Sequence, residues 1–127
     1  MNVAKVKTEL SKKYPHGNIK ENKDPVSGEI IEIVCEIDRK VIGSERNVAV
    51  VVADRVLEHY HKKTTEEYEV LTGELTVYLN GRPTKLKKSD RIITPPGTRH
   101  RSEGKETWFL CYSVPDWTAA DFYLVEK

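Results

Sequence analysis

Four side chains in this sequence have the types and spacing that a transition-metal site requires. His59 and His61 are separated by one residue, Glu66 follows shortly after them, and His100 lies further along the chain. Imidazole nitrogens and carboxylate oxygens are common ligands of divalent transition ions. The chain has 4 histidines, and three of them belong to this set. The sequence therefore predicts one metal site with three nitrogen donors and one oxygen donor.

β-Strands are the elements that would bring these donors together. Side chains alternate between the two faces of a strand, so His59 and His61 would point to the same side. Glu66 would come from the next strand and His100 from a third. A bulge near the histidines would reverse part of this parity.

The pattern from residue 30 onward indicates an all-β protein. Short segments rich in β-branched and aromatic residues alternate with turn residues. The predicted strands are residues 30–37, 47–57, 68–71, 75–79, 84–86, 91–94, a short strand opened by His100, 107–114 and 122–125. The apolar run Val48–Ala53 is typical of a strand buried on both faces, and Asn80-Gly81 predicts a hairpin. Many short strands favour a sandwich or barrel, whose interior can hold a ligand.

Several features outside the strands complete the expected domain. Val3, Val6 and Leu10 are spaced as on one side of a helix, so residues 2–13 are predicted to form a helix that packs outside the core. Residues 22–29 are polar and predict a loop, and residues 103–105 predict a turn. We find no linker, so we expect one domain over residues 1–127, with the barrel at about 30–126.

Composition excludes several classes of protein. The chain has 127 residues, of which 38% are hydrophobic and 32% are charged, and its net charge is only +1. Such a balance argues against a dedicated nucleic-acid binder and against a membrane span. No signal peptide is visible, so we expect a cytoplasmic location. Glutamine is absent and Lys and Glu are abundant, which favours a thermophilic source.

The two cysteines are predicted to be reduced thiols inside the protein. Cys35 and Cys111 are far apart in the sequence and do not have the spacing of metal ligands. A disulfide between them and a catalytic thiol are the alternatives.

The histidine segments resemble the two motifs of the cupin superfamily. His59-x-His61, Glu66 and Gly73 match the first motif in register, with Ala53 in place of its opening glycine. Pro95-x-Gly97-x-x-His100 matches the second motif, in which Ser89 and Gly104 replace the opening glycine and the closing asparagine. The resemblance covers about residues 47–114, and the departures concern turns and not the ligand types.

This resemblance implies a double-stranded β-helix, or jelly roll, with a metal inside the barrel. His59, His61, Glu66 and His100 would be its ligands, with one or two positions left for water or substrate. The ion could be Zn, Fe, Mn, Ni, Co or Cu, because ligand type alone does not select among them. The expected partner is a small-molecule substrate or ligand.

Three functions fit such a site. The first is a sugar or sugar-phosphate isomerase, because the chain resembles cupin-type phosphoglucose and mannose-6-phosphate isomerases. In that reaction Glu66 or Tyr68 would be the catalytic base and Arg55 would bind an anionic group. The alternatives are a mononuclear metal dioxygenase and a non-catalytic sensor that only binds a small ligand. Whether the protein is an enzyme is left open by the sequence.

The C-terminal segment suggests self-association. Residues 122–125 are apolar and would form an exposed strand edge in a monomer, which is unfavourable. We therefore predict a homodimer.

Overall fold

The protein folds into a curved antiparallel sheet with one helix packed outside it. The computed structural model describes residues 1–38, 47–115 and 119–125. The elements are α1 (Val3–Lys13), β1 (Asn18–Lys23), β2 (Ile30–Asp38), β3 (Asn47–Tyr60), β4 (Thr65–Thr72), β5 (Leu75–Leu79), β6 (Arg82–Leu86), β7 (Arg91–Thr94), β8 (His100–Val114), the 3-10 helix η1 (Ala119–Asp121) and β9 (Tyr123–Leu124).

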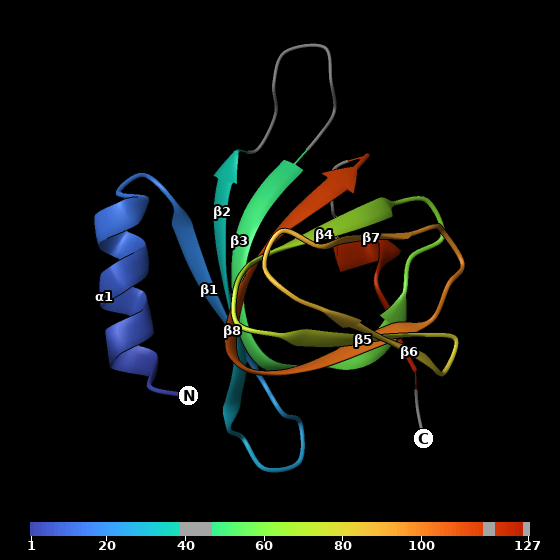
Figure 1. Ribbon diagram of the computed structural model, residues 1–127, viewed down its shortest axis with the longest axis horizontal. Coiled ribbons are helices and arrows are strands. Elements are labelled where there is room, and N and C mark those ends of the chain that lie inside the picture. The colour runs from blue at the N-terminus through green and yellow to red at the C-terminus, as the bar shows by residue number, and fades with distance from the viewer. Residues whose placement is uncertain (39–46, 116–118, 126–127) are drawn as a thin grey trace.

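Two long strands, β3 and β8, organise the sheet. β1, β2, β3 and β8 are hydrogen-bonded neighbours in that order, and β8 continues to β4, which pairs with β7. β8 also pairs with β5, whose other neighbour is β6, and β9 adds to the end of β3. In Figure 1 the helix lies on one side of β1, β2 and β3, and the strands β4 to β7 lie on the other side. The barrel interior is therefore enclosed between β1–β3 and the later strands.

The helix forms where the sequence predicts it and begins one residue later. The side-chain oxygen of Asn2 accepts a hydrogen bond from the backbone N–H of Lys5 at 3.2 Å, which caps the first turn. Two lysines in the last turn complement the negative end of the helix dipole. Val6 and Leu10, one turn apart, are fully buried against the outer face of the sheet.

The core confirms that β3 is buried on both faces. Val51 and Ala53 belong to a cluster inside the barrel with Tyr68 and Phe109. The alternate residues of β3 join a second cluster, which packs under the helix and contains Val6, Leu10, Ile33, Cys35, Val50, Val52 and Trp108. A strand covered by the helix on one face and by the barrel on the other needs apolar residues at every position.

Two tight turns close the barrel near the predicted site. Asn80 and Gly81 both have positive φ, 49° and 83°, and join β5 to β6 as the expected hairpin. Gly97 has a φ of 82° in the corner between β7 and β8, and its N–H donates to the carbonyl oxygen of His61 at 2.6 Å. This corner is thereby tied to the segment that carries the first two histidines.

The structure corrects two local expectations. β1 precedes residue 30 and overlaps the loop predicted at 22–29; its polar, mostly exposed sequence gave no strand signal. Residues 103–105 form no turn, because β8 runs continuously from His100 to Val114. Its pairing with β3 shifts register between Ala53 and Arg55, so the strand bends there without ending.

None of the helical segments within residues 1–38, 47–115 and 119–125 has the length and apolarity needed to cross a bilayer.

Candidate metal centre

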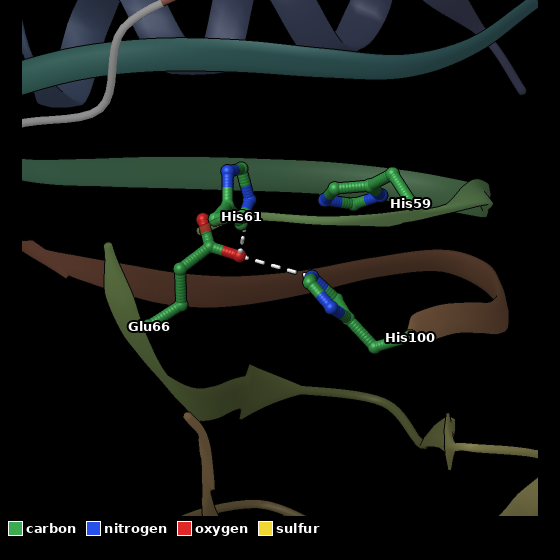
Figure 2. Close-up of side chains that lie close together, drawn as sticks. All are labelled: His59, His61, Glu66 and His100. Carbon is green, nitrogen blue, oxygen red and sulfur yellow. Dashed lines mark hydrogen bonds and ion pairs between the residues drawn. The ribbon is translucent and has the colours of Figure 1, made fainter. Parts of the chain in front are cut away.

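Three strands bring the four predicted ligands to one point inside the barrel. His59 is near the end of β3, His61 follows directly after it, Glu66 is the second residue of β4 and His100 is the first residue of β8. All four side chains are buried, and their donor atoms lie within 4.8 Å of one another. Figure 2 shows the carboxylate of Glu66 between the rings of His61 and His100, with His59 beside them. The predicted set therefore converges in space.

The three imidazole rings are held in the form that binds a metal through Nε2. His59 Nδ1 lies 2.7 Å from the carbonyl oxygen of Leu57, and His100 Nδ1 lies 3.1 Å from that of Thr98. His61 Nδ1 lies 2.7 Å from the carbonyl oxygen of Asp121. A carbonyl oxygen only accepts hydrogen bonds, so each Nδ1 must carry the proton and donate it. Each neutral ring then presents the lone pair of Nε2 to the cluster.

Glu66 is the centre of this arrangement. Its Oε1 lies 3.0 Å from His100 Nε2 and 3.2 Å from His61 Nε2. Its Oε2 accepts a hydrogen bond from the Cys111 thiol at 3.3 Å. Burial alone would raise the pKa of Glu66, but its contacts with His100 and His61 outweigh burial and hold the pKa far below the usual range. Glu66 is therefore ionised and able to act as an anionic ligand.

The donor atoms present fit a divalent cation. Within the described part of the chain, the buried His61 Nε2 has no hydrogen-bond partner, although it faces the Glu66 carboxylate. Two Nε2 lone pairs and a carboxylate oxygen repel one another unless a proton or a cation lies between them. Ligands about 2.1 Å from one ion can be about 4.2 Å apart, so the largest separation here would have to shorten only slightly. The four residues could thus bind one metal ion, whose identity the donor types leave open.

The pKa values of His59 and His61 are shifted in opposite directions, because their neighbours differ. Desolvation, assisted by repulsion from His100, lowers the pKa of His59 to about 4, so this ring is neutral near pH 7. Burial also opposes protonation of His61, but the adjacent Glu66 carboxylate outweighs it and raises the pKa of His61. A proton thus competes with a metal for Nε2 of His61 more than for Nε2 of His59.

A cavity of about 450 Å³ opens beside the cluster. His59 and Glu66 form part of its wall, so a bound ion would be reached from this side. Most of the lining is apolar and comes from β2, β3, β8 and the C-terminal segment; it includes Ile31, Val34, Val51, Val56, Leu57, Phe109, Phe122 and Leu124. Such a cavity holds a small molecule and excludes much of the surrounding water.

Glu32 is a second carboxyl group in this cavity, and the sequence analysis did not identify it. It lies on β2, opposite Ala53 of β3, and its Oε1 accepts a hydrogen bond from the Asn22 amide at 2.6 Å. Burial raises the pKa of Glu32 to about 7, despite the opposing hydrogen bond from Asn22. The alternating pattern of β2 places Glu32 on the face opposite to Ile33 and Cys35, which pack under the helix. Only the closed barrel shows that the face with Glu32 lines a cavity.

The other two predicted site residues have different surroundings. Tyr68 is buried in the barrel core, packs on Phe109 with ring centroids 4.9 Å apart, and contributes to the cavity wall. Burial and the nearby Glu66 raise the pKa of Tyr68 well above its ordinary value, so its hydroxyl stays protonated. Arg55 is not among the described residues that line the cavity; its guanidinium is half-exposed and paired with Asp24.

Both cysteines are free thiols, as the sequence analysis expected. Cys35 is buried under the helix. Cys111 lines the cavity, where burial and the neighbouring Glu66 raise its thiol pKa well above the ordinary value. A protonated Cys111 orients Glu66 as a hydrogen-bond donor, a role that the sequence did not indicate.

Comparison with known proteins identifies relatives over part of the chain. Residues 48–107 match the family described as "Cupin domain". The chain is 34% identical to quercetin 2,3-dioxygenase of Bacillus subtilis over 47 residues, which are 37% of this chain and 14% of that protein. It is 31% identical to the uncharacterized protein MJ1618 of Methanocaldococcus jannaschii over 78 residues, covering 59% of this chain and 62% of the relative. The matches therefore span less than two thirds of the length of either relative.

Solved structures share the fold over most of the chain. A cupin-2 domain protein from Rhodospirillum rubrum superposes with a TM-score of 0.74 at 11% identity, covering 90% of this chain and 78% of that one. Streptomyces Pac13, described as a nucleoside dehydratase, has a TM-score of 0.73 at 21% identity, covering 89% and 88% of the two chains. The all-β fold with one N-terminal helix is thus the double-stranded β-helix that the motifs predicted. The family match thus covers residues 48–107, and the solved structures show the same fold over most of the chain.

Proposed function

We propose that this protein is a metal-dependent enzyme that isomerises a small sugar or sugar phosphate by proton transfer. One observation carries the proposal: three Nε2 atoms and the Glu66 carboxylate converge at the wall of a cavity that also holds a second carboxyl group, Glu32. A divalent ion bound there would polarise a carbonyl oxygen of the substrate. The proposal rests on the geometry of this chain, because its named relatives match it over only part of their length.

Glu32 is suited to move the proton in such a reaction. An aldose–ketose isomerisation moves one hydrogen from carbon 2 to carbon 1 and one from oxygen 2 to oxygen 1, so no oxidant is needed. A carboxyl group with a pKa of about 7 can both accept and return a proton near neutral pH. The Asn22 amide holds one oxygen of Glu32 in place. We assign Glu32 to the transfer between the two carbons.

The roles predicted for Glu66, Tyr68 and Arg55 stay predictions. Glu66 would serve as the base only after releasing His61, His100 and Cys111, and its lowered pKa makes it a weak base. Tyr68 keeps its proton, so we expect it to donate a hydrogen bond to a substrate oxygen. Arg55 would have to leave Asp24 to meet an anionic substrate.

The metal site is tested first by replacing one ligand. We expect His61→Ala to lose most of the bound metal, because one of four donors is removed, while the β-rich circular dichroism spectrum is kept. Elemental analysis of protein purified from its own host measures the metal. His16→Ala is the matched control, since His16 lies exposed in the turn after α1. Equal metal content in both variants and the parent would refute the site.

The reaction is tested with a panel of sugar phosphates in deuterated water. We expect exchange of a substrate C–H hydrogen with solvent without oxygen uptake, and we expect Glu32→Gln to slow this exchange at least 100-fold while metal content stays unchanged. If Glu32→Gln exchanges the hydrogen at the parental rate, Glu32 does not transfer the proton between the two carbons. Tight binding of a panel compound with no turnover would indicate a binding module in place of an enzyme.

A metal-dependent dioxygenase is the second candidate. It is favoured by the mostly apolar cavity lining and by the partial similarity to quercetin 2,3-dioxygenase. Oxygen uptake with an enediol or flavonol, together with bound iron, nickel or copper, would select this function over the isomerase.

A further inference from the structure

The C-terminal segment, residues 119–125, contacts the metal centre although it lies outside the residues that match the cupin domain. We propose that Asp121 in this segment is a positioning residue that sets the orientation of His61 for metal binding. The inference depends on the proposed metal site and adds to it a requirement that neither histidine motif contains. Three sets of contacts support it.

The first set fixes the backbone between two ligands. The Asp121 carboxylate accepts hydrogen bonds from the backbone N–H groups of Lys62 at 2.9 Å, Lys63 at 3.0 Å and Thr64 at 3.0 Å. These three residues connect His61 to β4, which carries Glu66. A carboxylate that accepts three amide hydrogens holds such a loop in one conformation. The distance between the two ligands is therefore constrained from outside the loop.

The second contact fixes the ring. The backbone carbonyl oxygen of Asp121 accepts the Nδ1 proton of His61 at 2.7 Å. His59 and His100 make the equivalent bond to carbonyl groups two residues before them, on or next to their own strands. Of the three Nδ1 hydrogen bonds, only that of His61 goes to a segment 60 residues away. The tautomer and direction of His61 thus depend on where Asp121 is held.

The third set anchors the segment independently of the Asp121 side chain. Tyr123 stacks on Tyr60 with ring centroids 5.1 Å apart, and the Val125 N–H donates to the Glu58 carbonyl oxygen at 3.0 Å. Phe122 stacks on the ring of His59 with centroids 4.6 Å apart. Removal of the Asp121 carboxylate should therefore loosen the loop that follows His61 without detaching the segment.

Cobalt binding tests the proposal without any substrate. We titrate the metal-free protein with Co²⁺ and follow the visible absorption bands, whose energies and intensities report ligand geometry. We expect Asp121→Ala to weaken Co²⁺ binding about 10- to 100-fold, the usual effect of losing a group that orients a ligand, and to alter the bands. Asp121→Asn, which keeps one acceptor oxygen, should fall between this variant and the parent.

The matched control is Asp90→Ala. The Asp90 carboxylate also accepts a backbone hydrogen bond in a turn, from Lys87 at 2.8 Å, but Asp90 is exposed and does not contact the four ligands. We expect its Co²⁺ affinity and spectrum to equal those of the parent.

The outcomes separate the two proposals. If the parent protein binds no Co²⁺, the metal site itself is wrong. If the parent binds Co²⁺ and folded Asp121→Ala or Asp121→Asn binds it with parental affinity and spectrum, only the positioning role is wrong. Should Asp121→Ala fail to fold, Asp121→Asn decides the question alone.

Discussion

At the scale of single residues, the chemistry of the site comes from two carboxyl groups in different surroundings. Glu66 lies against His100 and His61 and stays ionised, whereas Glu32 is desolvated and accepts a hydrogen bond from the Asn22 amide. Glu66 is thus suited to bind a cation, and Glu32 is suited to exchange a proton. The two carboxyl groups differ in this way because their environments differ.

The raised pKa of Glu32 predicts how stability depends on pH. The folded state binds this proton more tightly than the unfolded state, in which the pKa is about 4.5, so stability falls as pH rises from about 4.5 through 7. This difference in pKa between the two states corresponds to about 3 kcal/mol. We expect Glu32→Gln to equal the parent at pH 4 and to exceed its stability at pH 8.

Urea unfolding of both proteins with a chelator at each pH measures this difference. Glu29→Gln, which changes an exposed glutamate near the start of β2, is the control and should follow the parent at both values. A parental pH dependence in Glu32→Gln would show that Glu32 is not desolvated in solution.

The spacing of the histidines predicted the convergence of four side chains, because each motif places its ligands through local strand and turn geometry. Glu32 could not be recognised in this way, since its position in the cavity depends on barrel closure across β2 and β3. Asp121 was missed for a different reason: it contacts His61 through a backbone oxygen, which leaves no residue type to recognise.

At the scale of elements, α1 stabilises the outer face of the sheet and is separate from the cavity. We expect Leu10→Ala to lower the free energy of unfolding by about 2–5 kcal/mol, because it removes a fully buried side chain from the cluster with Ile33 and Val52. Metal affinity should stay at the parental value. Lys12→Ala, an exposed change on the same helix, is the control, and a loss below about 1 kcal/mol in Leu10→Ala would contradict the docking of α1.

Elements with a strong hydrophobic pattern were predictable and elements without one were not. The buried positions of α1 and β3 follow directly from their apolar periodicity. β1 has little apolar content, and its strand conformation is imposed by pairing with β2. Between Glu103 and Thr107, β8 shifts register against β3, and its other neighbour changes from β5 to β4. A local reading of the sequence suggests a turn at these residues.

At the scale of the whole molecule, association of two chains stays a prediction. β9 pairs with β3, yet Phe122 and Leu124 remain 36% and 47% exposed beside the cavity. We expect sedimentation at micromolar concentration to give twice the 14.6 kDa mass of one chain, because burial of such side chains favours contact between copies. The mass of a single chain would contradict the homodimer.

The thermophilic source also stays a prediction from composition. Abundant Lys and Glu with no glutamine favour a melting temperature well above the roughly 45–65 °C of mesophile domains. Calorimetry of the metal-loaded protein measures it, and a value inside that range would overturn the inference.

A main-chain oxygen accepts the Nδ1 proton of each of the three imidazoles. Substitutions at Leu57 or Thr98 would therefore leave the acceptor atom in place, provided that the backbone keeps its course. The residues that line the cavity could therefore change, by evolution or by design, while the four side chains that could bind a metal keep their orientation.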